Sequence, residues 1–401
     1  MRILHTSDWH LGQNFFDFDR GDEHACFLDV LYSTAKEKTP DVIVVSGDIF
    51  DVTAPSIPAQ ELYNERMIRL SELKIPIVVT AGNHDSASRL EVNGPLWNAF
   101  GLTVVGNLQL LSDGSVDADK HIVEIPGKGF VAAVPYIYKY SYPKMADKPD
   151  ASVEERMECF HNTILRRVAE RNAADLPVVM MAHTAVTGNV EVAELSERAA
   201  SMEFYSTQVM GQGWDYLALG HIHRPSGMCN KRVRYCGSPI PLSFDETSPR
   251  SLSIVDIAGH GAEPQIELVE IPVKRKMLTI PAEPKPLAEA IGELARLDPD
   301  EDCYVRLNLL ITDYAEGSTA LLAANALQGK KARYCGTKIT KLEATSEGTV
   351  ERPVVSVANI NNDPMAIAKM YYKQKYNTEM NDELAELLKQ VIDETKNEIR
   401  L

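Results

Sequence analysis

Short apolar runs, each followed by polar residues, recur along the first 245 positions of the chain. Runs of this length bounded by turn signals are typical of buried strands. The segments that fit are residues 3–5, 42–45, 77–80, 131–134, 178–181 and 216–219. Between them, residues 24–38 and 58–73 repeat apolar side chains at every three to four positions, which indicates helices. Alternating strands and helices predict an α/β core whose sheets are covered by helices.

The pattern changes after residue 250. Segments 251–257 and 266–271 alternate apolar and polar residues and predict a hairpin that closes a first domain, residues 1–272. A smaller α+β unit follows, to which we assign residues 273–350. Its predicted strands are 276–280, 304–311 and 332–342, and its predicted helices are 286–297 and 318–327.

The last part, residues 357–401, is predicted to be a linker and C-terminal helices. Residues 357–364 are polar and turn-rich, and Asp363 with Pro364 suits the start of a helix that reaches about residue 374. Asn381 is placed to cap a second helix, whose apolar residues between 384 and 399 share one face. That face needs a cover, which either its own domain or a partner protein would provide.

Composition limits the class of protein. The chain has 401 residues, a formal net charge of -16 and 44% apolar residues, so it has material for a large core and is not a disordered chain. The acidic balance argues against coating nucleic acid by bulk charge. No secretory signal or membrane span is recognised, and six scattered cysteines favour reduced thiols, so we expect a soluble, cytoplasmic protein.

Candidate chemistry is concentrated in five short clusters, each directly after one of the predicted strands. Ligands gather at the carboxyl ends of strands in α/β sheets, so these clusters can meet at one site. The metal-capable residues are Asp8, His10, Asp48, Asn83, His183, His221 and His223. Any one cluster alone occurs by chance, but the shared context favours a site.

The donor types suit a pair of hard or borderline divalent metals such as manganese, iron or zinc. The seven residues give each of two metals four ligands if Asp48 bridges both. Asp8, His10 and His223 then complete one metal; Asn83, His183 and His221 complete the other. Two metals about 3.5 to 4 Å apart can clamp a phosphate and activate water, which predicts phosphoester hydrolysis.

One further histidine, His84, directly follows Asn83 and is the candidate to protonate the leaving oxygen or to stabilise the transition state. Either Asp51 or Asp85 could orient it. Asp51 is favoured to lie near the metals because it ends the same turn as Asp48.

These clusters, in this order, resemble the calcineurin-like metallophosphoesterase superfamily. ILHTSDWHLG, SGDIFD, AGNHD, LGHIHR and RYCGSPIPLSFDE together resemble, more narrowly, its SbcD family of nuclease subunits. The resemblance is strong through about residue 245 and implies a sandwich of two sheets flanked by helices, followed by a capping domain. It places the family's ligand roles on the seven residues above and its catalytic histidine role on His84. Some relatives have histidine at the position of Asp51, and a glycine often precedes the position of His183, where this chain has alanine.

The resemblance also implies function and partners. It implies manganese-dependent cleavage of DNA, as 3'-5' double-strand exonuclease and as single-strand or hairpin endonuclease, in recombination and repair. An SbcC-type ATPase would be the partner, bound through the C-terminal helices. A homodimer would pair residues 58–73 and 93–100 across a twofold axis, although the same apolar residues could belong to the core.

Local basic residues could follow DNA phosphates despite the acidic total, and a plain solvated surface explains each of them about equally well. The candidates are Arg224, Arg232, Arg234, Lys330, Lys331 and Arg333. Two alternatives remain. One is an enzyme for small phosphodiesters or nucleotides, which the two appended domains disfavour. The other is a non-catalytic scaffold, which the complete ligand set disfavours.

Overall fold

The computed structural model describes residues 1–187, 204–227, 231–311 and 319–341, and in the tail residues 372, 380–381 and 384–389. The chain divides into two units, Met1–Leu342 and Glu343–Leu401, and each is described by itself. The predicted linker at 357–364 and the helix expected up to about residue 374 lie outside the described residues, apart from residue 372.

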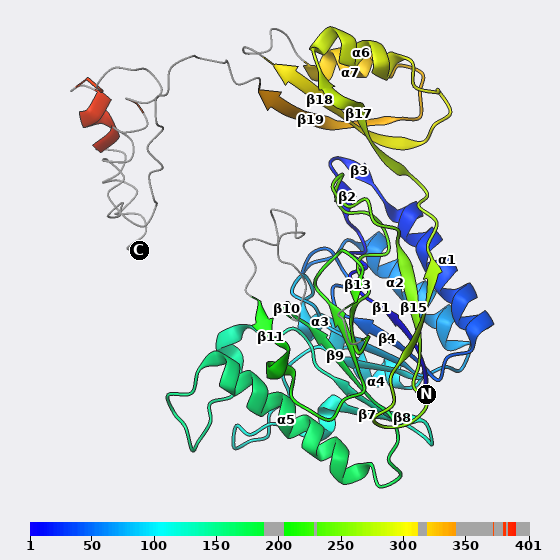
Figure 1. Ribbon diagram of the computed structural model, residues 1–401, viewed down its shortest axis with the longest axis vertical. Helices are drawn as coiled ribbons and strands as arrows, with labels where there is room; N and C mark the ends of the chain where they lie inside the picture. The colour runs from blue at the N-terminus through cyan, green and yellow to red at the C-terminus, as the bar shows by residue number, and fades with distance from the viewer. Residues whose placement is uncertain are drawn as a thin grey trace. The chain divides into compact units, whose positions relative to one another are not determined.

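A first six-stranded sheet is built around the N-terminal strand (Figure 1). Its strands, in spatial order, are β16 (Gln265–Glu270), β15 (Ser251–Asp256), β1 (Arg2–Thr6), β4 (Val42–Ser46), β5 (Ile77–Thr80) and β6 (Leu102–Val105). Strands β1, β4, β5 and β6 are parallel to one another, and β15 and β16 add an antiparallel hairpin at the edge beside β1. The predicted strands and hairpin of this region are thereby confirmed.

A second six-stranded sheet packs against the first. Its spatial order is β13 (Ser226–Gly227), β14 (Val233–Tyr235), β12 (Tyr216–Gly220), β9 (Val178–His183), β8 (Gly129–Ala133) and β7 (Ile122–Ile125). Residues of the inner faces, such as Val44 and Val78 from one sheet and Val179 and Ala218 from the other, share one buried cluster. The expected sandwich of two sheets is present. Two short ribbons, β2 (Asn14–Phe15) with β3 (Phe18–Asp19) and β10 (Val186–Thr187) with β11 (Tyr205–Ser206), lie outside the two sheets.

Helices cover both outer faces of the sandwich. Residues of α1 (Gly21–Lys38), α2 (Ile57–Ser71), α3 (Ala87–Glu91) and α4 (Gly94–Asn98) pack on the first sheet. Short 3-10 turns occur at η1 (Ala118–His121), η2 (Lys139–Ser141) and η5 (Thr207–Met210). The second sheet is covered by α5 (Val153–Arg171), a helix that was not among those predicted. Its signal was present: Ser152 and Glu155 form a capping box.

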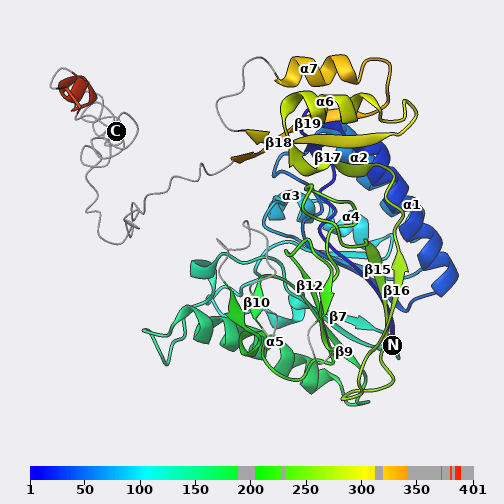
Figure 2. The same ribbon diagram turned by 45° about the horizontal axis from the view of Figure 1, so that its top comes forward.

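The expected β-α-β-α-β unit follows the hairpin and has a core of its own. Three parallel strands, β17 (Lys276–Lys285), β18 (Cys303–Ile311) and β19 (Arg333–Lys341), form its sheet. Both helices, α6 (Leu287–Ala295) and α7 (Thr319–Ala326), lie on the same face of it (Figure 2). The opposite face brings Tyr304 and Cys335 against Phe15 of the β2–β3 ribbon. We call this unit the cap.

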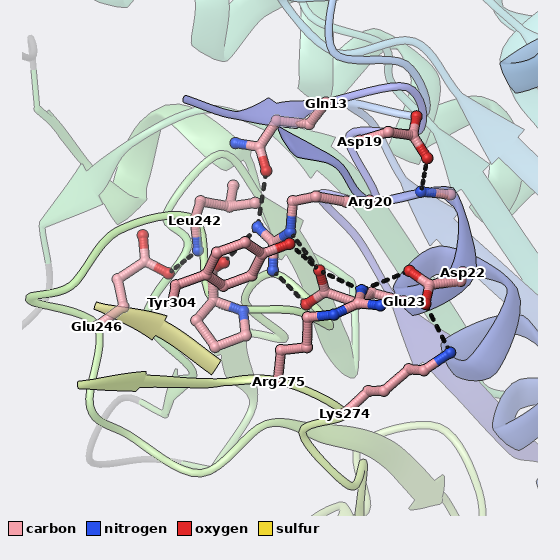
Figure 3. Close-up of polar contacts among 12 residues, drawn as sticks. Gln13, Asp19, Arg20, Asp22, Glu23, Leu242, Glu246, Lys274, Arg275 and Tyr304 are labelled. Carbon is pink, nitrogen blue, oxygen red and sulfur yellow. Dashed lines mark hydrogen bonds and ion pairs between the residues drawn. The ribbon is translucent and has the colours of Figure 1, made fainter. Parts of the chain in front are cut away.

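A buried polar network joins the cap to the sandwich (Figure 3). Glu23, at the start of α1, accepts hydrogen bonds from both Arg20 and the hydroxyl of Tyr304, the latter at 2.6 Å. Arg275, just before β17, pairs with Asp22 and reaches Glu23 at 3.4 Å. Because the Glu23 carboxylate contacts Arg20, Arg275 and Tyr304, specific side-chain contacts hold the cap to α1. We call this network the junction.

In the tail, Asn381 makes the capping hydrogen bond that the sequence predicted. Its Oδ1 accepts a hydrogen bond from the backbone N–H of Leu384 at 2.9 Å, and residues 384–389 are helical. Leu387 is 60% exposed. None of the described helices is long and apolar enough to cross a membrane. The five cysteines in the described ranges are free thiols, as expected.

Candidate metal centre

The five clusters of the sequence meet where the two sheets present the carboxyl ends of their parallel strands. Asp8 and His10 follow β1, Asp48 follows β4 and Asn83 follows β5, all in the first sheet. From the second sheet, His183 ends β9, while His221 and His223 follow β12. Topology alone therefore brings residues more than 200 positions apart into one site.

The backbone at this site is strained. Asp8, His10, Asp48 and His221 all have positive φ, between 49° and 93°, in a region that residues other than glycine seldom occupy. Backbone hydrogen bonds hold two of these turns: Asp8 N–H donates to the carbonyl of Gly47, and His10 N–H donates to that of Asp48, both at 3.0 Å. Strain of this kind is found at functional sites, where the surrounding structure overcomes its cost.

One group of donors consists of Asp8, His10, Asp48 and His223, whose ligand atoms lie within 4.8 Å of one another. The Nε2 atoms of His10 and His223 face each other at 3.2 Å, and His10 Nε2 is 3.6 Å from Asp48 Oδ2. These are the residues assigned to one metal from the sequence. Buried carboxylates with imidazole nitrogens turned toward a common point are a donor set that a divalent cation satisfies.

A second group also contacts Asp48. His183 Nε2 is 3.2 Å from Asp48 Oδ2 and 3.1 Å from Asn83 Oδ1, and His221 Nδ1 is 2.8 Å from the same amide oxygen. His183 Nδ1 donates to the carbonyl of Ser46 at 2.8 Å, which turns Nε2 toward Asp48 and Asn83. Asp48 is thus the residue common to both groups.

Electrostatics at the centre follow from burial and from the charge of Asp48. Burial would raise the pKa of Asp48, but His183, His10 and the N–H of His84 hold it well below its usual range. Burial lowers the pKa of His183, yet the Asp48 charge outweighs this effect and raises that pKa to about 9. The pKa of His221 falls to about 3 through burial and the nearby His183. The Asp48 charge therefore favours cations in the space that these imidazoles surround.

Two glycines allow the ligands to approach so closely. A Cβ atom on Gly47, whose φ is +83°, would lie 2.2 Å from His183 Nδ1. A Cβ on Gly82 would lie 2.1 Å from Asp48 Oδ1. The glycines of the SGD and AGN segments are therefore required by packing around the donors.

His84 lies beside the first group, with its ring centroid 4.8 Å from that of His10. Its Nδ1 contacts the backbone carbonyl of Asp51 at 2.8 Å, whereas the Asp51 carboxylate lies 3.1 Å from His10 Nδ1. Asp85 accepts three backbone N–H groups from neighbouring turns, and burial together with the Asp48 charge raises its pKa to about 6. The backbone carbonyl of Asp51 therefore contacts the His84 ring, whereas the Asp85 carboxylate holds the neighbouring turns through their backbone N–H groups.

Two residues around His223 were given no role from the sequence. Glu246 Oε1 lies 3.6 Å from His223 Nδ1. Arg250, which is buried, donates to the carbonyl of His223 at 2.8 Å and to Glu246 at 3.0 Å. A carboxylate behind a ligand histidine fixes its ring and tautomer. Glu246 lies within the RYCGSPIPLSFDE motif, so a signal for it was present.

The six basic candidates for DNA contact are placed very differently. Arg234 is buried and donates to Ser253, and Arg232 donates to two backbone carbonyls. Lys330 donates to carbonyls at the end of α6, and Arg333 pairs with Asp302 of the cap. The exposed ones are Arg224 and Lys331, the second paired with Asp300. Internal contacts therefore occupy most of this set.

Comparison with known proteins identifies the relatives of the chain. The pattern of the calcineurin-like phosphoesterase family matches residues 1–225. The SbcD subunit of nuclease SbcCD from Rhodobacter capsulatus is 33% identical over 365 residues, covering 86% of this chain and 88% of that protein. The protein of the same name from Escherichia coli K12 is 32% identical over 321 residues, 78% of each chain. A dimetal phosphatase from Danio rerio matches in structure with a TM-score of 0.38 and 12% identity, covering 68% of this chain and 99% of that one.

Proposed function

The chain belongs to the calcineurin-like phosphoesterase family and, within it, to the SbcD family of SbcCD nucleases, and we propose that it hydrolyses DNA phosphodiester bonds as the nuclease component of such a complex. The observation that carries this proposal is the donor set around Asp48, which two sheets assemble from five separate segments. The relatives supply the substrate class, because both carry the name of a nuclease.

For the ligands we keep the division made from the sequence. Asp8, His10 and His223 would hold one ion, Asn83, His183 and His221 the other, and Asp48 both. When bound, the two ions would orient the phosphate, neutralise its charge and lower the pKa of attacking water. The metal is proposed to be manganese, although these donors also suit iron and zinc.

His84 is proposed as the catalytic acid. The contact of its Nδ1 with the Asp51 carbonyl requires that nitrogen to carry the proton when the ring is neutral, because a carbonyl can only accept. Nε2 is then the atom that holds and delivers a proton to the leaving oxygen of the cut strand. The Asp51 carboxylate also contacts His10 Nδ1. Asp51 thus positions His84 with its backbone carbonyl and His10 with its side chain.

The finer activity is proposed from the family resemblance: 3'-5' exonuclease action on duplex ends, and endonuclease action on single strands and hairpins. An SbcC-type ATPase would bind the C-terminal helices, where Leu387 is exposed. A homodimer is supported by exposed apolar residues in the segments proposed to pair, namely Ile68, Leu96 and Phe100. Of the basic candidates, Arg224 and Lys331 are retained as contacts with DNA phosphates.

One assay tests the function. The purified chain, with and without an SbcC-type ATPase, is incubated with manganese and either linear DNA, hairpin DNA or a small phosphodiester such as bis-p-nitrophenyl phosphate. We expect manganese-dependent cleavage of all three. Hydrolysis of the small ester with no action on either DNA, even with the ATPase, would instead identify an enzyme for small phosphodiesters. Removal of residues 360–401 should abolish capture of the ATPase and spare hydrolysis of the small ester.

A further inference from the structure

Three tyrosines extend outward from the metal centre along one segment after β8. Tyr136 is half-buried, and its ring centroid lies 6.2 Å from the rings of both His183 and His221. The backbone N–H of Tyr136 donates to the carbonyl of Ala81 at 2.8 Å, just before the turn that carries Asn83. The first tyrosine of the segment is therefore fixed to the same turns as the metal donors.

The next two tyrosines lead into solvent. The ring of Tyr138 stands 5.1 Å from that of Tyr136, edge to face, and Tyr138 is 67% exposed. Tyr140 is 76% exposed, and Lys139 places its Nζ 5.1 Å from the Tyr140 ring. Large aromatic side chains this exposed bury little surface within the chain itself, so packing does not explain them.

We propose that Tyr136, Tyr138 and Tyr140 form a stacking track for unpaired nucleobases of the strand to be cut. Tyr136 lies at the phosphodiester-cleaving centre, Tyr138 contacts it and Tyr140 follows two residues later at the surface, a spacing that suits a ligand whose bases lie along a chain of phosphates. Aromatic faces bind successive bases without sequence preference, and a nearby lysine attracts the backbone. The track rests on the proposed function and refines it, because it would favour looped or frayed DNA over closed duplex.

The net charge of -16 makes such a track useful. The bulk charge of this chain repels phosphates, and internal contacts occupy most of the basic candidates. Stacking does not depend on net charge. The track would therefore supply affinity for an unpaired strand that persists when salt weakens the contacts with phosphates.

The experiment compares two double variants of the full chain, Y138A/Y140A and Y138F/Y140F. Phenylalanine keeps the aromatic face and removes only the hydroxyl. Substrates are a hairpin with 2-aminopurine in a thymine-rich loop, a blunt duplex with the same stem, and bis-p-nitrophenyl phosphate. The readouts are 2-aminopurine quenching on binding, KM and kcat for each DNA, and the ratio of hairpin cleavage to hydrolysis of the small ester.

The alanine variant should bind the loop about tenfold or more weakly, with the loss in KM, since stacking contributes about 1–3 kcal/mol per base. Its ratio of hairpin cleavage to small-ester hydrolysis should fall by a similar factor, and the phenylalanine variant should keep quenching and affinity. Equal loop binding by the alanine variant and the wild type would overturn the track. So would a loss confined to capture of the ATPase, which would make the tyrosines a protein-binding surface. A wild type that hydrolyses only the small ester would refute the proposed function and the track together.

Discussion

The metal centre and the junction beneath the cap both bury carboxylates, and they compensate the negative charge in different ways. At the junction, Glu23 accepts hydrogen bonds from Arg20 and Tyr304, and Asp22 pairs with Arg275. The positive charges there are thus arginine side chains of the chain itself. At the metal centre, the partners found for Asp8 and Asp48 are imidazoles, a serine hydroxyl and backbone N–H groups.

This difference separates a structural network from a binding site. Burying an ion is costly unless it is paired, and a chain that provides its own partner gains a fixed contact. Where imidazoles surround a carboxylate instead, a bound metal can displace the proton of a charged imidazole such as His183 and take over the charge balance. Stability should therefore depend on the junction with or without metal, and on the metal centre only when metal is supplied.

The largest effect should come from Asp48→Ala. Because Asp48 is shared by both donor groups, we expect loss of both ions and a fall of phosphodiester hydrolysis to the background rate. Metal content measured on the purified variant checks the first point. Manganese should raise the thermal midpoint of the wild type, since a ligand that binds the folded state stabilises it, and should leave that of the variant unchanged. A variant that retained both metals would show that Asp48 does not bridge.

A smaller but still large effect is expected for His84→Ala. The variant should keep its metals, because His84 is outside both proposed ligand sets, and should lose about 10²- to 10⁴-fold in kcat through the missing proton donor. Single-turnover cleavage with saturating manganese measures it. Full activity of this variant would remove His84 from the mechanism. Loss of metal together with activity would move it into the ligand set.

The metal centre could be predicted from the sequence, whereas the junction could not. The ligand clusters are visible in the sequence because each follows an apolar strand and the strand ends of a parallel sheet converge, as for Asp8 and Asp48. The junction was not predicted. Glu23 meets Tyr304 across 281 positions, and no local pattern of charge indicates which of many acidic residues is buried with an arginine.

At the metal centre, the sequence predicted the donor residues but not the groups that orient them. The carbonyl that orients His183 belongs to Ser46, and a backbone atom has no sequence signature. Asp85 was one of the two residues that could orient His84, but its oxygens accept loop N–H groups, a distinction that depends on side-chain direction. Basic candidates such as Arg234 could not be sorted into buried and exposed, because the sequence around an arginine does not show where its side chain points.

At the junction, Glu23→Ala should cost about 3–5 kcal/mol in the free energy of unfolding, because it leaves Arg20 buried without its carboxylate partner. Urea denaturation, followed for the cap and the sandwich together, measures this loss. Glu267→Ala is the matched control: it also removes a paired carboxylate, but one that is mostly exposed beside Lys38, and its effect should be much smaller. Equal effects of the two variants would refute the distinction between the buried and the surface pair.

The smallest effect, and the one with a pH signature, is expected for Asp22→Asn. Its hydrogen bond with Arg275 holds the pKa of Asp22 below the ordinary value, despite partial burial. A lowered carboxyl pKa means that the folded state favours the charged form, so the stabilisation is present above about pH 4 and is lost as pH falls through the folded-state value. Since Asp22 is partly exposed, the difference in unfolding free energy from wild type should be under about 1 kcal/mol at pH 7. It should shrink steadily below about pH 4, and a difference that stayed constant down to about pH 2 would show that the ionised carboxylate is not what holds the cap.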